Sequence, residues 1–163
     1  MTREAKLVGA LLGIAGGVIV LITTLATFLL ASGAPAQLRT VFRLLCHGME
    51  NRCLTLLGTP MPVCSRCMAI YGGLLAGVLL FAAISWLRSH PVPPWGMVLA
   101  LVPLAIDGIT QAAGLRESTN ELRMLTGLLA GSGFAIWALG AVESSSRQRL
   151  ETLKIESLTG EKV

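Results

Sequence analysis

Charged side chains are scarce in this sequence. They make up 13% of its 163 residues, whereas soluble globular domains carry about a quarter. So few charges cannot cover the surface of a water-soluble fold, and this excludes a soluble domain. The net charge of +4 does not indicate nucleic-acid binding, because most basic residues flank apolar runs. A chain that is 53% hydrophobic, with a mean hydropathy of +0.72, is instead predicted to be an integral membrane protein of one domain.

Four long apolar runs predict an all-α, four-helix membrane bundle, with spans at residues 7–32, 67–87, 95–114 and 124–142. Each run is long enough to cross a hydrocarbon core of about 30 Å. A cleavable signal peptide is an alternative for the first run, but signal peptides have shorter apolar segments, so a retained helix is preferred. Residues 143–163 form a polar tail, for which a weakly amphipathic helix and disorder both remain open.

Four spans place both termini on one side of the membrane. The positive-inside rule does not settle which side, because arginine and lysine divide evenly between the two faces. Lysine occurs only on the side of the termini, which favours cytoplasmic termini in an inner (plasma) membrane. Glycines recur at four-residue spacing within three spans, a pattern that lets helices approach closely in lipid; these are Gly9, Gly13 and Gly17, Gly73 and Gly77, and Gly127 and Gly131.

Polar side chains gather at the membrane face opposite the termini. Asp107 lies in the last third of the third span, where an ionisable residue is costly and marks a functional site. It is predicted either to act as a general base or to form a structural ion pair with Arg116 or Arg123. The residues predicted to contact an anionic substrate or a lipid head group are Arg52, Arg66, Tyr71, Gln111, Arg116, Asn120 and Arg123. Interfacial anchoring to lipid phosphates is preferred for Arg39 and Arg43.

All four cysteines lie in the first loop or at its end. Cys64 and Cys67 form a C-x-x-C, a spacing that binds one metal ion or closes a reactive disulfide. With Cys46 and His47 upstream, the loop offers the four nitrogen and sulfur ligands of a tetrahedral site. Adjacent ligands are geometrically awkward, so Cys53 is an alternative to one of them. Zinc is the preferred metal and iron the second choice.

Two other interpretations of the cysteines remain open. The first is thiol–disulfide exchange, with the pairs Cys46/Cys53 and Cys64/Cys67 in a bundle laid out like the quinone-coupled disulfide-forming enzymes. A helix N-terminus and a neighbouring arginine would both favour a thiolate there. The second is a set of structural thiols or disulfides. The helical spacing of apolar residues at 38–45 further predicts a short interfacial helix within the loop.

The chain is similar to a known family of small prokaryotic membrane proteins, domain of unknown function 2085, over residues 38–131. The first matching motif comprises Cys46-His47, Arg52, Pro62-Val63-Cys64-Ser65-Arg66-Cys67 and Tyr71-Gly72. The second comprises Asp107-Gly108-Ile109-Thr110-Gln111, Arg116-Glu117-Ser118-Thr119-Asn120, Arg123 and Thr126-Gly127. Ala69 replaces an expected glycine and Cys53 an expected non-cysteine. The second departure favours the ligand set Cys46, His47, Cys64 and Cys67. The family implies no reaction.

Three function classes therefore remain: a metal-dependent enzyme acting on a lipid or anionic substrate, a redox enzyme, and a non-catalytic metal-binding or transport component. In the first class, Asp107 is the general base and Arg116 and Arg123 hold the charge of the substrate. A metal that structures a lid is preferred to a catalytic one, because a site with three thiolates and a histidine is normally closed. The oligomeric state is not predicted.

Overall fold

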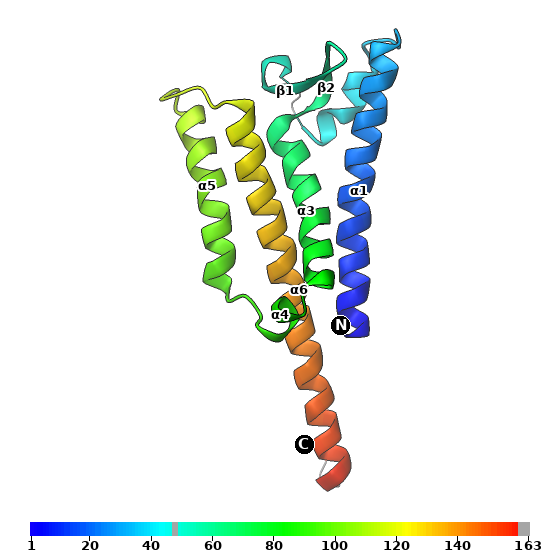
Figure 1. Ribbon diagram of the computed structural model, residues 1–163, viewed down its shortest axis with the longest axis vertical. Helices are drawn as coiled ribbons and strands as arrows, with labels where there is room; N and C mark the ends of the chain where they lie inside the picture. The colour runs from blue at the N-terminus through cyan, green and yellow to red at the C-terminus, as the bar shows by residue number, and fades with distance from the viewer. Residues whose placement is uncertain (47–48, 160–163) are drawn as a thin grey trace.

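A computed structural model describes residues 1–46 and 49–159, and it confirms the all-α membrane architecture. In the described part of the chain, four helices are long and apolar enough to cross a bilayer. They are α1 (Arg3–Ala31), α3 (Ser65–Ala83), α5 (Pro94–Ala112) and α6 (Asn120–Thr159). Figure 1 shows them side by side in the order α5, α6, α3, α1. A short helix, α4 (Ser85–Ser89), leads from α3 towards α5.

Helix α6 extends far beyond the bundle. Its 40 residues span about 60 Å at 1.5 Å per residue, roughly twice the hydrocarbon core. The segment 143–159, for which the sequence left helix and disorder open, continues α6 as a helix that projects past the other elements (Figure 1). It contains neither proline nor glycine and has several strong helix formers. Where this segment begins, the Thr2 N–H donates to the carboxylate of Glu143 over 2.6 Å, and this hydrogen bond connects the start of α1 to α6.

Helices α3 and α6 pack at backbone distance through their glycines. A Cβ added at Gly73 would lie 2.6 Å from the carbonyl oxygen of Leu128, and one at Gly77 would lie 2.6 Å from that of Ser132. Side chains at these positions would force the helices apart, as the small-residue spacing predicted. On α1 the close approach to α3 occurs at Gly16, whereas a Cβ at Gly13 would meet its neighbours at ordinary distances of 3.6 Å or more.

The first loop contains more structure than the sequence indicated. The expected short helix is present as α2 (Leu38–Val41) and the 3-10 turn η1 (Phe42–Leu44). After a second 3-10 turn, η2 (Glu50–Arg52), the chain forms an antiparallel hairpin of β1 (Cys53–Leu56) and β2 (Thr59–Cys64). Its two-residue turn has positive φ at Leu57 and Gly58, the type I′ geometry that suits the twist of a hairpin.

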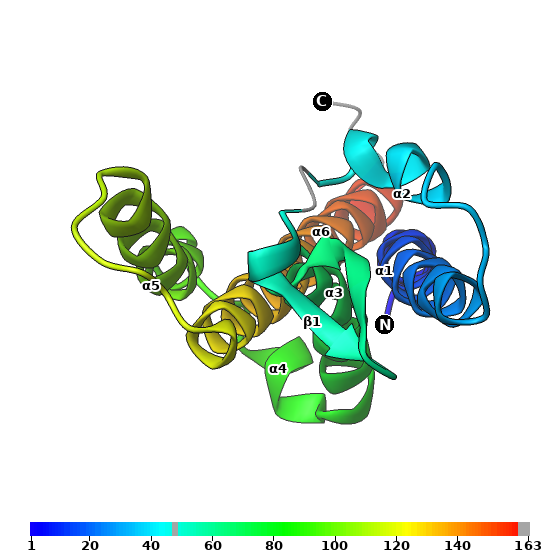
Figure 2. The same cartoon turned by 90° about the horizontal axis from the view of Figure 1, so that it is seen from above.

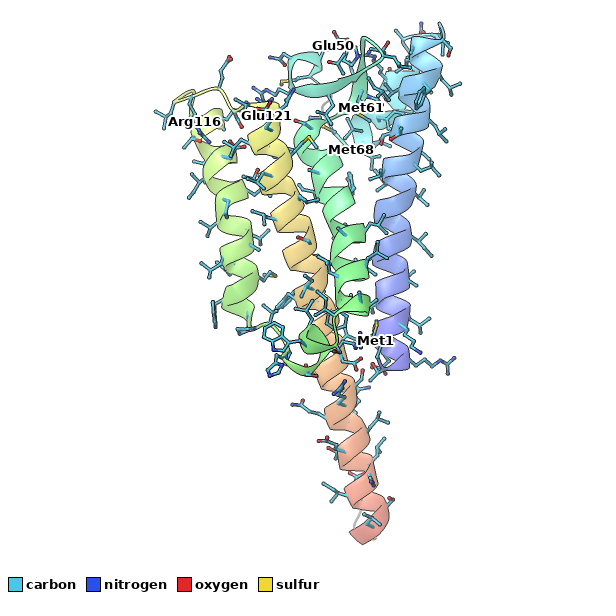
Figure 3. The ribbon with its side chains drawn as sticks, viewed as in Figure 1. Met1, Glu50, Met61, Met68, Arg116 and Glu121 are labelled. Atoms are coloured by element: carbon cyan, nitrogen blue, oxygen red, sulfur yellow. The ribbon has the colours of Figure 1, made fainter. Side chains whose placement is uncertain are left out.

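An apolar cluster holds this loop against the membrane helices. Phe42 of η1 and Val63 of β2 are buried together with Ala26 of α1. The hairpin and the α5–α6 connection lie at the same end of the bundle, opposite the N-terminus (Figure 1), and Figure 2 shows the bundle from above. In Figure 3, Glu50 and Arg116 mark this end and Met1 marks the other. The predicted convergence of the first loop with the ends of α5 and α6 is therefore present.

Candidate metal centre and cationic pocket

Three cysteines from two segments of the first loop meet at the start of α3. The sulfur atoms of Cys46, Cys64 and Cys67 all lie within 4.8 Å of one another, and all three residues are half-buried. Cys46 follows η1, Cys64 ends β2 and caps α3, and Cys67 lies in the first turn of α3. His47, the predicted fourth ligand, lies outside the described residues. Sulfur ligands of one tetrahedral zinc ion, at about 2.3 Å each, are spaced on this scale.

Local hydrogen bonds position these thiols. The backbone N–H of Cys64 donates to Cys46 Sγ over 3.4 Å, and the N–H of Cys46 donates to the carbonyl of Phe42 over 2.9 Å. Cys46 and Cys67 also pack against the apolar cluster of Phe42 and Val63. The sequence builds the thiol triangle because the turn and the hairpin that carry Cys46 and Cys64 share one small core.

The thiols differ in their acidity. Hydrogen bonding from Cys67 lowers the pKa of Cys64 to about 5, so Cys64 is a thiolate at neutral pH. Burial raises the pKa of Cys53 to about 11, and its Sγ–H donates to the carbonyl of Met49 over 3.1 Å. Cys53 is 3% exposed and lies outside the group of three sulfurs. Cys67 keeps its proton, because it is the donor of the hydrogen bond to Cys64. The triangle thus offers three soft sulfur donors, which suit zinc or iron once the metal has displaced their protons.

Asp107 of α5 pairs with two arginines, one on α3 and one in the connection between α5 and α6. Its Oδ2 accepts from Arg66 of α3, and its Oδ1 accepts from Arg116 over 2.9 Å. Arg66 also donates to Gln111 Oε1 over 3.2 Å. The side chain of Asp107 is only 2% exposed. Of the two structural partners predicted for Asp107, Arg116 is present. Arg66 is an additional partner, which the sequence predicted only as a substrate contact.

Asn120 connects the first loop to α6. Its Oδ1 accepts from Ser65 Oγ over 3.1 Å and from Arg123 over 2.9 Å, while its Nδ2 donates to the carbonyl of Cys53 over 3.4 Å. Ser65 is completely buried, and its one hydroxyl proton is shared between Asn120 and the carbonyl of Arg52, which also lies at 3.1 Å. Because Ser65 and Arg66 directly follow Cys64, the thiol triangle and the arginines form one assembly of adjacent residues. Ser65 was not predicted, although its place between Cys64 and Arg66 in the first family motif is a signal that could have found it.

A polar pocket of about 480 Å³ opens beside this assembly, between the first loop and the α5–α6 connection. Its lining residues are Asn51, Arg52, Gln111, Gly114, Arg116, Glu117, Ser118 and Arg123. Four of the predicted substrate contacts, Arg52, Gln111, Arg116 and Arg123, belong to this lining. Arg66, Tyr71 and Asn120 do not, and neither does Asp107. Asn51 and Gly114 were not predicted. Glu117 and Ser118 were not among the predicted contacts either, although they fall within the second family motif, which carried a usable signal.

Together these features define a multi-span membrane protein with a thiol cluster beside a cationic pocket. The profile of the family described as "Predicted membrane protein (DUF2085)" matches residues 46–137, more than half of the chain, and the chain belongs to this family. That range contains all three thiols, Asp107 and the lining of the pocket.

Two archaeal relatives support this assignment. An uncharacterized protein of Methanocaldococcus jannaschii is 45% identical over 95 residues, which cover 58% of this chain and 61% of the relative. An uncharacterized protein of Methanothermobacter thermautotrophicus is 40% identical over 95 residues, covering 58% of this chain and 85% of the relative. No solved structure matches the chain.

Proposed function

We propose that this protein binds one zinc ion through Cys46, Cys64, Cys67 and His47, at one face of the cell's inner (plasma) membrane. The observation that carries the proposal is the convergence of three sulfurs within 4.8 Å. The metal holds the first loop as a lid beside the cationic pocket, which receives an anionic molecule. Iron is the second choice, because thiolates also suit iron.

A structural lid accounts for the site better than metal catalysis does. Three thiolates and an imidazole fill the coordination sphere of zinc and leave no position for water or substrate. Both oxygens of Asp107 accept hydrogen bonds from guanidinium groups. That arrangement suits an anchor which orients Arg66 and Arg116 more than it suits a general base.

Thiol–disulfide exchange is the second candidate function, and the low pKa of Cys64 is the observation that favours it. The arrangement of the sulfurs favours metal binding. Exchange between two cysteine pairs requires Cys46 to form a disulfide with Cys53, whereas the sulfur of Cys46 lies within 4.8 Å of the sulfurs of Cys64 and Cys67.

The test is metal analysis of the full chain, purified in detergent without added metal and without chelator. We expect about one zinc per chain in the wild type and in Cys53→Ser, and little or none in Cys64→Ser and Cys67→Ser. Cys53→Ser is the matched control, because it alters a thiol of the same loop outside the triangle. Metal-free protein in which mild oxidation joins Cys64 to Cys67 reversibly would overturn the zinc proposal in favour of exchange.

A further inference from the structure

The walls of the pocket carry an excess of positive charge. Three guanidinium groups line it, from Arg52, Arg116 and Arg123, against the single carboxylate of Glu117. Beside the lining, Asp107 forms ion pairs with both Arg66 and the lining residue Arg116, so its one negative charge balances one of these two cations. The pocket is therefore left with two positive charges that the described residues do not balance.

Arg123 points to a ligand independently of this count. It is 5% exposed, and its Nε is buried without a hydrogen-bond partner among the described residues. Its Nη1 donates to Asn120, a neutral acceptor. Arg52 and Arg66 are close enough to repel it more strongly than Asp107 and Cys64 attract it. A buried cation beside other cations is costly unless an anion compensates it.

Arg52 supplies a second unsatisfied donor group. Its side chain is half-buried and lines the pocket, yet within residues 1–46 and 49–159 its guanidinium forms no hydrogen bond or ion pair. Helix α6 starts at Asn120, two residues after the lining residue Ser118, and its N-terminus carries a partial positive charge. The volume of about 480 Å³ falls in the range of small-molecule sites, roughly 300–1,000 Å³, so a ligand larger than a bare ion fits.

We propose that the pocket binds a phosphate monoester, with its phosphoryl oxygens held by Arg52, Arg116 and Arg123. A phosphate monoester carries a charge of about −1.5 to −2 at pH 7 and three strong acceptor oxygens. That charge matches the excess on the walls, and guanidinium groups bind phosphate oxygens in bidentate pairs. A carboxylate or a phosphodiester carries one negative charge and leaves one cation unbalanced. The inference rests on the anion site of the proposed function and names its ligand class.

The same phosphoryl group has two sources, a soluble monoester and a lipid head group. We would place the full chain, with its metal, in nanodiscs of phosphatidylcholine and measure binding of glycerol 3-phosphate by calorimetry. A parallel arm uses nanodiscs containing phosphatidic acid or, as the diester control, phosphatidylglycerol, with lipid retention read by native mass spectrometry. Binding in the first arm alone identifies a soluble ligand, and retention of phosphatidic acid over phosphatidylglycerol identifies a lipid. Either result supports the proposal.

The variants are Arg52→Gln and Arg123→Gln, with Arg43→Gln as the matched control. Arg43 is exposed, belongs to η1 in the same loop and does not line the pocket. We expect at least a tenfold loss of affinity in Arg52→Gln, which breaks no ion pair, and no change in Arg43→Gln. Wild-type binding should weaken as the pH falls from 7.5 to 5.5, because the second phosphate pKa is about 6 and the monoester then loses its second charge.

Three results would overturn the phosphate assignment: no binding in either arm, equal binding by Arg52→Gln and Arg43→Gln, or tighter binding of acetate and of phosphatidylglycerol. Zinc content is measured on the same samples. Retained zinc without phosphate binding refutes this inference and leaves the metal proposal standing, whereas phosphate binding without zinc refutes the metal proposal alone.

Discussion

Replacing Gly73 with alanine should separate α3 from α6. The added Cβ would lie 2.6 Å from the carbonyl oxygen of Leu128 and 3.0 Å from the backbone nitrogen of Ser132. Ordinary non-bonded contacts lie near 3.5 Å, so the helices must part by roughly 0.9 Å, a gap that forfeits about a quarter to a half of each local dispersion contact. Overpacking of this kind costs about 1–3 kcal/mol.

Gly72 provides the control at the neighbouring position. A Cβ there would meet nothing within 4 Å, so Gly72→Ala gains the better helix propensity of alanine, up to about 1 kcal/mol, without a clash. Gly73→Ala gains the same propensity, so the two variants differ by the overpacking cost alone, and we expect Gly73→Ala to be less stable by about 2 kcal/mol. For a chain of this length that difference lowers the unfolding midpoint by about 4–8 °C.

The measurement is thermal unfolding of both variants in the same detergent, followed by circular dichroism. A reversible titration with sodium dodecyl sulfate gives the corresponding free energies. Equal midpoints for the two variants, or a higher midpoint for Gly73→Ala, would show that the α3–α6 contact is looser than described, and the close-packing argument would fail.

Two further predictions follow from the buried polar groups. Asp107→Asn leaves Arg66 and Arg116 without their carboxylate, and we expect the free energy of unfolding in the sodium dodecyl sulfate titration to fall by about 3 kcal/mol. Adding Arg66→Gln should restore part of this loss, and additive losses in the double variant would contradict the coupling between Asp107 and Arg66. In metal-stripped protein, thiolate is lost from Cys64 below about pH 5 and from Cys53 below about pH 11. The rate of site-resolved alkylation should therefore level off with rising pH by about pH 7 for Cys64 and continue to rise beyond that pH for Cys53. Parallel pH profiles for the two cysteines would refute the assignment.

The membrane architecture was predictable because apolar length and glycine spacing are local properties of the chain. Gly73 and Gly131 face each other as the four-residue spacing implied, with 3.1 Å between the Cα of Gly131 and a Cβ placed on Gly73. The meeting of the cysteine loop with the ends of α5 and α6 followed from counting spans. The hairpin did not follow, because β2 contains Pro60 and Pro62 and its turn is Leu-Gly where Asn-Gly is usual.

The partners of individual polar side chains also escaped the sequence. Asp107 and Gln111 are four residues apart and share one face of a helix, but this spacing does not show that Arg66 reaches both of them from another helix. Tertiary packing determines such contacts.

The continuity of α6 has a mechanical consequence. One uninterrupted helix carries Arg123 at one membrane face and, about 24 Å past Glu143, ends at Thr159 on the other side. Hydrogen-bonded helices resist bending and twisting, so a partner molecule that binds the projecting end and rotates it would rotate Arg123 and Asn120 as well. Ligand binding in the pocket on one side of the bilayer and partner binding on the other side would then act on the same rigid helix.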